Sequence, residues 1–346
     1  GDVYKRQWST LEKSFIEKGD ASVLQSRTKN QTEGLVAVQE FLEMVNNYLS
    51  VGGTEEAQVL IDQAVALGNP FAASPLVYYY KAYVCLLEGN RGDAGAQLEK
   101  ANSLSHINQY PLRIEEVKMF DTLTAAFADN AFLHYHYGNL LYYIGQKEHG
   151  LAEWTRSTEL DGTFAVALRN VGFAYGQKGE WQKAMSYYDR AIKANPDDAL
   201  LFTESDKIYE SANVDAAARL KRLESNIKTV MKHDDAVMRL LSLYNVTGKY
   251  DKAIQIMHNR HFHLWEGGGQ IHGIYADSHM LKGMTLLAKK NYQKAIQEFD
   301  LATQYPANLE VAPSYRGGYE AKAYYLAGEA YEGMKQAGKA QEFYQK

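Results

Sequence analysis

The sequence predicts an all-α fold, a right-handed superhelical solenoid of stacked antiparallel helix pairs. Gly138 and Gly172 lie 34 residues apart, and each stands in the same pattern of small, aromatic and aliphatic residues. A period in the mid-thirties is typical of helix pairs that cannot bury their apolar faces alone and therefore stack on their neighbours. Stacked arrays of this kind usually bind proteins or peptides, so the period favours an interaction module.

The repeat is clearest at residues 165–198. Its first half has small and apolar residues at helical spacing, namely Leu168, Val171, Gly172 and Tyr175. Its second half has the same spacing in Ala184, Tyr188 and Ala191. Gly179 supplies the turn between the two helices. Pro196 ends the second helix, because proline lacks an N–H and disfavours helix in the residue before it.

This unit resembles the tetratricopeptide repeat in its small-residue, tyrosine, alanine and proline positions. The same template predicts further units of uneven quality, and the unit near 199–232 is degenerate because Asp206 stands where the repeat has glycine. An unpaired helix is expected near 113–127. The predicted array spans 8–346, with units near 38–71, 75–108, 131–164, 165–198, 199–232, 234–267, 276–307 and 321–346.

Both ends of the chain are expected to be artificial. Residues 2–7, Asp-Val-Tyr-Lys-Arg-Gln, match the translation of a transposon adaptor used in DNA library preparation, so residues 1–7 are predicted to carry no structure. At the other end, Lys346 falls inside the second helix of the last predicted unit, where a terminal repeat normally has a capping helix. The sequence is therefore expected to be an internal fragment of a longer protein.

Composition argues against two classes of partner. The chain has 37 Lys and Arg against 42 Asp and Glu, a net charge of −5, so no basic excess exists to neutralise nucleic-acid phosphates. Lys81 interrupts the most apolar run, which therefore falls short of the ~18 residues of a membrane span. Cys85 is the single cysteine and forms no internal disulfide, so cysteine usage leaves the compartment open, with the cytoplasm favoured.

Catalytic signatures are missing from the sequence. It has no phosphate-binding glycine loop ending in Lys-Ser or Lys-Thr, no His-Glu-x-x-His helix and no Gly-x-Ser-x-Gly elbow. We therefore predict no catalytic residues and no cofactor, and a scaffold rather than an enzyme.

One segment, residues 258–273, departs from the repeat pattern. It is rich in histidine and contains Trp265, Glu266 and three consecutive glycines. In a functional interpretation Trp265 offers a stacking face, Glu266 a carboxylate and the glycines a backbone that a ligand can approach closely. In the structural interpretation, which we prefer, Trp265 is buried in the seam between two stacked units while the glycines turn a corner.

The histidines of this region raise the question of zinc: His258, His261, His263, His272 and His279. None has a cysteine partner or a Cys-x-x-Cys clip, so no metal site is predicted. A glycosidase role for Glu266 would need a second carboxyl across ~5–9.5 Å. Asp277 and Glu310 are candidates, and no spacing selects either.

The same region carries a closer resemblance. Residues 262–268 (Phe-His-Leu-Trp-Glu-Gly-Gly), 305–309 (Tyr-Pro-Ala-Asn-Leu) and 111–115 (Pro-Leu-Arg-Ile-Glu) are similar to a group of bacterial tetratricopeptide-repeat proteins. Members of that group carry an N-terminal domain of unknown function that is similar to galactose mutarotases, and the resemblance covers nearly all of 35–346. They commonly have proline at the position of Leu264 and an acid followed by glycine at 269–270. The resemblance implies an absent β domain that handles carbohydrate, and hence an alternative function as the C-terminal part of a carbohydrate-active enzyme.

A known peptide-binding mode can be tested residue by residue. Asn139 and Asn170 match the asparagines of the clamp by which some tetratricopeptide arrays bind the C-terminal carboxylate of chaperones. Tyr135, Leu200 and Glu204 occupy the positions of its basic residues. A buried carboxylate needs paired cations, so binding of chaperone tails is rejected.

The predicted partner-binding residues lie on first helices and in the irregular loop. First helices line the inner wall in this architecture, and the two best-matched units place four side chains there. The partner is expected to be a peptide, a protein or the missing N-terminal domain, with no nucleic acid and no membrane. The predicted contact residues are Tyr135, Asn139, Arg169 and Phe173 on the helices, and His263, Trp265 and Glu266 in the loop.

Overall fold

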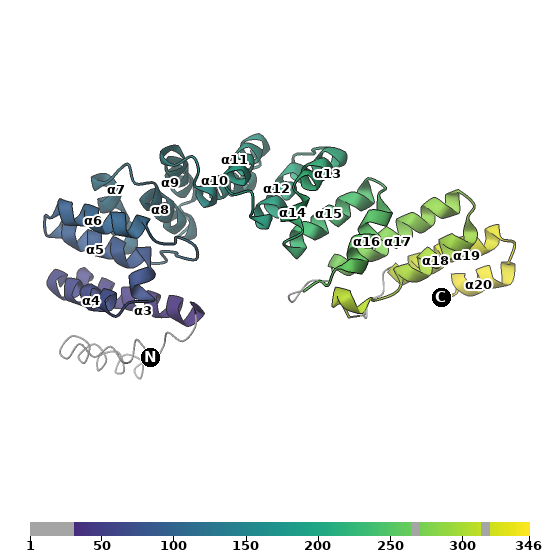
Figure 1. Cartoon of the computed structure of the whole chain (residues 1–346), viewed down its shortest axis with the longest axis horizontal. Coiled ribbons are helices and arrows are strands. Elements are labelled where there is room, and N and C mark those ends of the chain that lie inside the picture. Colours follow the sequence, from purple (N-terminus) through teal and green to yellow (C-terminus); the bar gives the residue numbers. More distant parts are fainter. Residues whose placement is uncertain (1–30, 264–269, 313–318) are drawn as a thin grey trace. The chain divides into compact units, whose positions relative to one another are not determined.

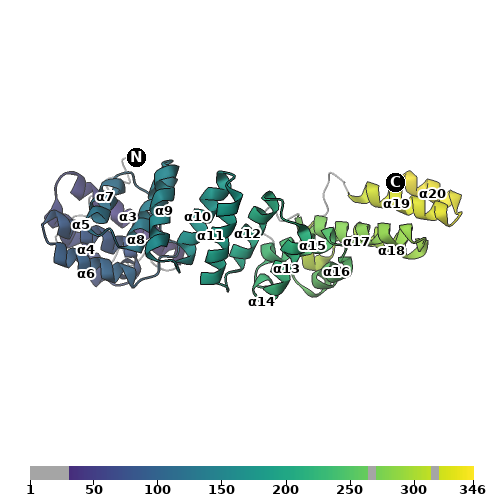
Figure 2. The ribbon, with the colours of Figure 1, turned by 90° about the horizontal axis from the view of Figure 1, so that it is seen from above.

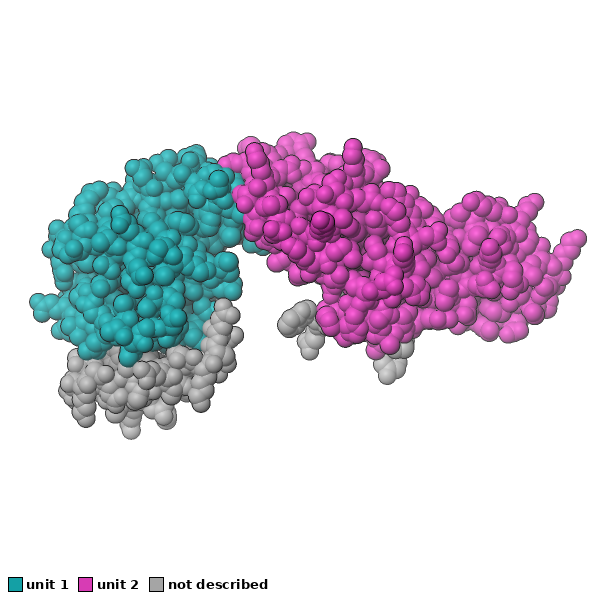
Figure 3. Space-filling view, in the orientation of Figure 1, with its two compact units in different colours: residues 1–171 teal, residues 172–346 magenta. Residues whose placement is uncertain are grey.

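The computed structural model describes residues 31–263, 270–312 and 319–346 (Figure 1). Across these ranges the ordered elements are all helices, with no strand, which confirms the all-α prediction. The chain divides into two compact units, Gly1–Val171 and Gly172–Lys346 (Figure 3). We call them unit 1 and unit 2 and describe each by itself.

Unit 1 contains helix pairs whose apolar faces meet in one core. Large side chains such as Phe41, Tyr79 and Phe120 are fully buried there. The unpaired helix predicted near 113–127 is α7, which packs against α5 and α8. The helices are α3 (Gln31–Ser50), α4 (Thr54–Ala66), η1 (Phe71–Ala73), α5 (Pro75–Leu87), α6 (Arg91–Asn102), α7 (Glu116–Ala126), α8 (Ala131–Tyr143), α9 (Lys147–Leu160) and the start of α10 (Ala165–Gln177).

Unit 2 continues with helix pairs, and α17 and α18 lie side by side in both views (Figure 1, Figure 2). Its buried residues form two clusters, one around Phe202, Leu241 and Phe262 and one around Phe299. The helices are α11 (Trp181–Ala194), α12 (Ala199–Ser211), α13 (Ala216–Ser225), α14 (Ile227–Val230), α15 (Asp234–Val246), α16 (Tyr250–Asn259), α17 (Gln270–Ala288), α18 (Tyr292–Ala302), η2 (Ala307–Leu309), α19 (Tyr319–Gly333) and α20 (Ala337–Tyr344).

Regular helix pairs share one close contact. A glycine in the first helix faces an aromatic ring sixteen residues later, and a Cβ built on that glycine would lie 2.4 to 2.9 Å from a ring carbon. Only glycine therefore lets the two helices approach this closely without a shift of the ring. The pairs are Gly138 with Trp154, Gly172 with Tyr188, Gly283 with Phe299, and Gly328 with Tyr344.

The helix pair α12 and α13, where a degenerate unit was predicted, has a different contact 34 residues after Gly172. Asp206 on α12 is 1% exposed and accepts two hydrogen bonds from Arg219, with Nε–Oδ1 and Nη2–Oδ2 distances of 3.0 and 2.8 Å. Arg239 on α15 donates to the same carboxylate at 2.7 Å and to Glu210 at 2.7 Å. A bidentate arginine satisfies a carboxylate geometrically, so the substitution of aspartate for glycine is matched by new partners.

In the part of the chain that the structure describes, no helix combines the length and the apolar character that crossing a bilayer requires.

Candidate functional site

In unit 1 the connection between α6 and α7 lies against the first helices of the unit. We call residues 103–115 the covering segment. It contacts α3 through Gln39, whose side-chain amide donates to the Tyr110 carbonyl at 3.0 Å and accepts from Arg113 at 2.8 Å. At the start of α5, the Ser74 hydroxyl donates to the Gln109 side chain at 2.8 Å. The segment is non-helical and spans α3 and α5, so this face already holds an irregular stretch of the chain's own backbone.

The covering segment also reaches α8, through His106. The His106 ring stacks on Phe132 with centroids 4.1 Å apart, and its Nδ1 lies 2.9 Å from Nε2 of His136. Burial lowers the pKa of His106 to about 4, and the nearby Asn102 backbone opposes this shift only in part. Burial and the neighbouring His106 lower the pKa of the fully buried His136. The two imidazoles are therefore a neutral pair at physiological pH.

Tyr135, the first of the predicted contact residues, lies among other aromatic rings. Tyr135 is 2% exposed, with its ring against His136 and Phe164. The template of the repeat places this position on the inner wall, but it could not anticipate that Phe164, in the connection between α9 and α10, packs against the Tyr135 ring. Tyr135 thus has almost no surface to offer a partner in this state.

The other predicted helix residues lie in different surroundings. The Asn139 side-chain oxygen accepts hydrogen bonds from the Trp154 indole at 2.9 Å and from the Asn170 amide at 3.1 Å. Both asparagines that match the chaperone-tail clamp are therefore bonded to each other. Arg169 is partly exposed, and Phe173 is an exposed aromatic at 40%.

Sequence reasoning missed the outer side of the covering segment. Four large apolar residues are exposed along eight positions. Single exposed apolar residues are normal on a protein surface, whereas a cluster of them indicates a contact surface. The available signal was the density of apolar residues between 107 and 114. The residues are Ile107, Tyr110, Leu112 and Ile114, exposed by 70, 48, 43 and 68%.

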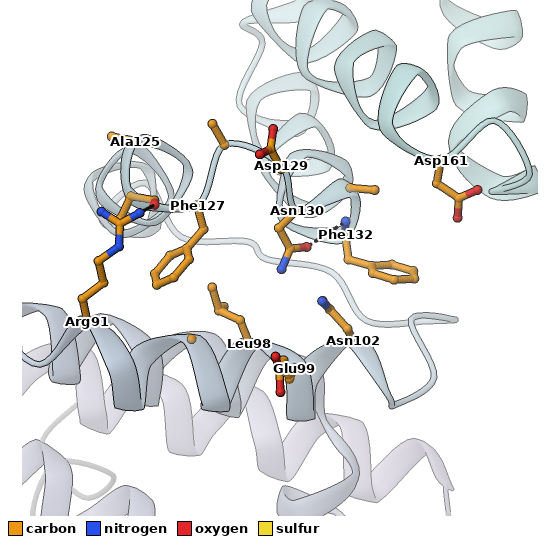
Figure 4. A pocket seen from close by; sticks show the side chains of 14 residues that line it. Arg91, Leu98, Glu99, Asn102, Ala125, Phe127, Asp129, Asn130, Phe132 and Asp161 are labelled. Carbon is orange, nitrogen blue, oxygen red and sulfur yellow. Dashed lines mark hydrogen bonds between the residues drawn. The ribbon is translucent and has the colours of Figure 1, made fainter.

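A cavity of about 750 Å³ lies between α6 and the connection from α7 to α8 (Figure 4). Figure 4 shows Leu98 and Phe127 facing each other across it. Arg91 is held at one end, donating to the Ala126 carbonyl and lying over the Phe127 ring. The lining has one guanidinium against three carboxylates, so a cationic or polar group fits better than an anion. These carboxylates belong to Glu99, Asp129 and Asp161.

The predicted loop site is described only in part. Trp265 and Glu266 lie outside the described residues, so the burial of Trp265 and the role of Glu266 stay predictions, as does the enzyme alternative that depends on them. His263, the remaining loop residue of that site, is described and exposed.

The structure brings His263 together with two other potential ligands. Nε2 of His261 lies 2.6 Å from Oε1 of Glu310, and Nδ1 of His263 lies 3.8 Å from the same oxygen. One ligand atom from each of the three residues lies within 4.8 Å of the others. Sequence reasoning predicted no metal site because it looked for cysteine clips, and Glu310 is 49 residues from His261. The available signal was the His-x-His spacing, which in extended backbone places both rings on one side.

Three segments of the chain match the tetratricopeptide-repeat family: residues 165–198, 276–308 and 321–346. Among solved structures, the chain is similar to YrrB, described as a TPR protein with an unusual peptide-binding site. The identity is 20%, over 54% of this chain and 91% of that chain, with a TM-score of 0.41.

Two further solved structures cover more of the chain. One is the C-terminal part of a TPR repeat-containing protein from Cytophaga hutchinsonii, with 13% identity over 78% of this chain and 98% of that chain and a TM-score of 0.42. The other is a tetratricopeptide repeat protein from Parabacteroides merdae, with 12% identity over 85% and 98% and a TM-score of 0.35. With the family matches and the helix pairs on which they fall, this chain contains tetratricopeptide repeats at 165–198, 276–308 and 321–346.

Proposed function

We propose that this protein is a non-catalytic interaction scaffold that binds a peptide or a partner domain through its first helices. The observation that carries the proposal is the covering segment: the first-helix face of unit 1 already holds a non-helical stretch of chain. Gln39 donates a hydrogen bond to the Tyr110 backbone carbonyl, and Ser74 donates one to the Gln109 side chain. A face that binds one non-helical segment has the chemistry to bind another, because side-chain amides and hydroxyls serve any peptide backbone.

The contact surface that we propose has two parts. One is the exposed apolar side of the covering segment, with Ile107 and Ile114 at its ends. The other is the group predicted from the repeat template, Asn139, Arg169 and Phe173, without Tyr135 because that side chain is buried. Exposed aromatic and arginine side chains are the types that most often dominate binding energy at protein interfaces.

The resemblance to bacterial proteins with a mutarotase-like domain suggests one partner of this kind. An N-terminal β domain of the same polypeptide would bind the array within one chain. In that arrangement we propose that the loop with His263, Trp265 and Glu266 also contacts the β domain, in addition to the two-part surface above.

The test begins with peptides selected from a display library on the purified chain. Their dissociation constants are then measured by fluorescence anisotropy for the wild-type protein and for Phe173→Ala, Arg169→Ala and Ile114→Ser. Loss of a central contact of about 2 kcal/mol weakens binding roughly 30-fold. Val246→Ala is the matched control, since Val246 is 72% exposed and lies outside the proposed surface.

Two results would count against the proposal. If the library yields no saturable binder, the scaffold assignment has no support. If binders are found but all three variants bind them as tightly as the Val246→Ala control, the protein binds peptides through another surface and the residue assignment is wrong.

A further inference from the structure

We propose that His261, His263 and Glu310 form a binding site for a divalent transition-metal ion of the zinc type, a property beyond the proposed scaffold function. The three side chains come from two segments of unit 2, the stretch after α16 and the residue after η2. Their ligand atoms already lie within 4.8 Å of one another.

The backbone after α16 places the two histidines on one side. Arg260 has φ −123° and ψ 137°, which is extended backbone, and side chains alternate between faces in such a stretch. Phe262 points inward and is 0% exposed, while His261 and His263 on either side of it are exposed. Burial of the phenylalanine therefore sets the direction of both imidazoles.

Hydrogen bonds hold this stretch in register with η2. The Phe262 N–H donates to the Asn308 carbonyl at 2.9 Å, and the Asn308 side-chain amide donates to the carbonyls of Met257 and Arg260 at 2.7 and 2.8 Å. These bonds fix the distance between the histidine segment and Glu310, two residues beyond Asn308.

Asp234, at the start of α15, holds the histidine segment from its other side. One carboxylate oxygen accepts the His263 N–H at 3.0 Å, and the other accepts the Arg260 guanidinium Nε at 2.8 Å. The backbone on both sides of Phe262 is therefore anchored, and preorganisation of the supporting residues is what makes a ligand set effective.

Glu310 has an uncommon backbone conformation that directs its carboxylate to the histidines. Its φ of 51° and ψ of 29° are left-handed, a region disfavoured for residues with a Cβ. Oε1 is thereby 2.6 Å from Nε2 of His261 and 3.8 Å from Nδ1 of His263. Tetrahedral zinc with ligands at ~2.1 Å has ligand atoms about 3.4 Å apart, so adjustments of about 1 Å bring these exposed side chains into place.

The donor set selects the class of ion. Two imidazole nitrogens and one carboxylate oxygen suit zinc, copper and nickel, whereas calcium and magnesium take oxygen ligands. The side chains of His261, His263 and Glu310 are 52, 79 and 41% exposed. A fourth position therefore faces solvent, as in zinc sites with three protein ligands.

The test is a calorimetric titration of the whole chain with ZnCl₂ at neutral pH, repeated with MgCl₂ and CaCl₂. We expect one zinc ion to bind per chain, and we expect the magnesium and calcium titrations to show no saturable binding. His261→Gln, His263→Gln and Glu310→Asn should each weaken zinc binding by at least the ~10–100-fold seen on loss of outer-shell partners. Asparagine tolerates the left-handed conformation at 310, so that variant keeps the backbone. His258→Gln is the matched control, an exposed histidine on α16 outside the cluster.

Cobalt provides a second readout, because its visible absorption reports the coordination geometry of the bound ion. Co²⁺ bound by these ligands should give tetrahedral visible absorption in the wild type and in His258→Gln, but not in the three ligand variants. Absence of saturable zinc binding would mean that His261 and Glu310 form an ion pair only, and the proposal would be wrong. Equal zinc affinity in the wild type and in the His261→Gln/His263→Gln double variant would also overturn it.

Discussion

Two successive helix pairs in unit 2 meet the same packing requirement with opposite chemistry. Where α10 crosses α11, Gly172 leaves room for the Tyr188 ring, and a Cβ there would lie 2.9 Å from the ring. In the next helix pair Asp206 stands 34 residues after Gly172, and it contacts Arg219 and Arg239 rather than an aromatic ring. This helix position, 172 in one pair and 206 in the next, therefore tolerates a large change in polarity when every buried charge receives a partner.

The glycine–aromatic contact and the Asp206 ion-pair network respond differently to a single substitution. An apolar contact can adjust, because a ring or a helix can shift by a few tenths of an ångström. A buried ion pair cannot, because removing one partner leaves the other charge desolvated. Arg219 is only 7% exposed, so the network around Asp206 falls in the second class.

The largest effect is expected for Asp206→Ala. It removes the bidentate partner of Arg219 and one partner of Arg239, and it should lower the free energy of unfolding by about 3–5 kcal/mol. Urea denaturation measures the change. Asp197→Ala is the matched control, because the side chain of Asp197 is 80% exposed in its pair with Lys232 and its loss should leave the midpoint in place. Equal midpoints for both variants would show that the Asp206 network is not the counterpart of the glycine contact.

Unit 1 buries polar groups that are neutral rather than charged, the imidazoles of His106 and His136. The folded-state pKa of His106 is about 4, below the ordinary value of 6.5, so between these pH values the unfolded chain binds a proton that the folded chain does not. Stability is therefore lost as the pH falls from 6.5 to 4, by about 3 kcal/mol at 1.36 kcal/mol per pKa unit.

Thermal unfolding of the wild type and of His106→Gln across this pH range measures that contribution. Glutamine keeps a hydrogen-bonding group next to His136 but does not titrate. The difference between the two unfolding midpoints should shrink or reverse on acidification. A difference that is constant with pH would mean that His106 does not supply the acid sensitivity.

A smaller effect is expected for Gly138→Ala. The added Cβ would lie 2.4 Å from the Trp154 ring and 2.9 Å from the Gly150 carbonyl, which is backbone and cannot rotate away. Overpacking of about 1–3 kcal/mol should outweigh the roughly 1 kcal/mol that alanine gains over glycine in a helix. Gly338→Ala in α20 is the control, since nothing lies within 4 Å of its Cβ position and the helix gain should appear alone. The two variants should shift the denaturation midpoint in opposite directions.

The smallest effect, none, is expected from deletion of residues 1–7. These residues match an adaptor translation and contain none of the residues that define the repeat. The deletion variant therefore serves as the reference of unchanged stability for the other variants. A fall in the thermal midpoint of several degrees, which corresponds to about 1 kcal/mol in a small domain, would show that they belong to the fold.

Sequence reasoning reached the features that depend on local spacing. Helical periodicity and the glycine template predicted the all-α class and the single helix α7, and they marked Asp206 as a departure from the glycine pattern. It did not reach features made by residues distant in sequence. The template placed Tyr135 on an open wall because nothing local to α8 shows that Phe164 packs against it. In the same way, nothing near His261 indicates Glu310, because their meeting depends on the bonds of Asn308.

The covering segment has a consequence for any competitor at the first-helix face of unit 1. The segment is a ligand tethered at both ends, and short tethers give effective concentrations in the millimolar range. A free peptide that binds the same groups has to compete with the segment. Its apparent affinity equals its intrinsic affinity multiplied by the fraction of molecules in which the segment has left the face. We therefore expect weak, promiscuous peptides to compete poorly for Gln39 and Ser74. A partner that contacts the exposed outer side of the segment, or Asn139, Arg169 and Phe173, is expected to bind without displacing it.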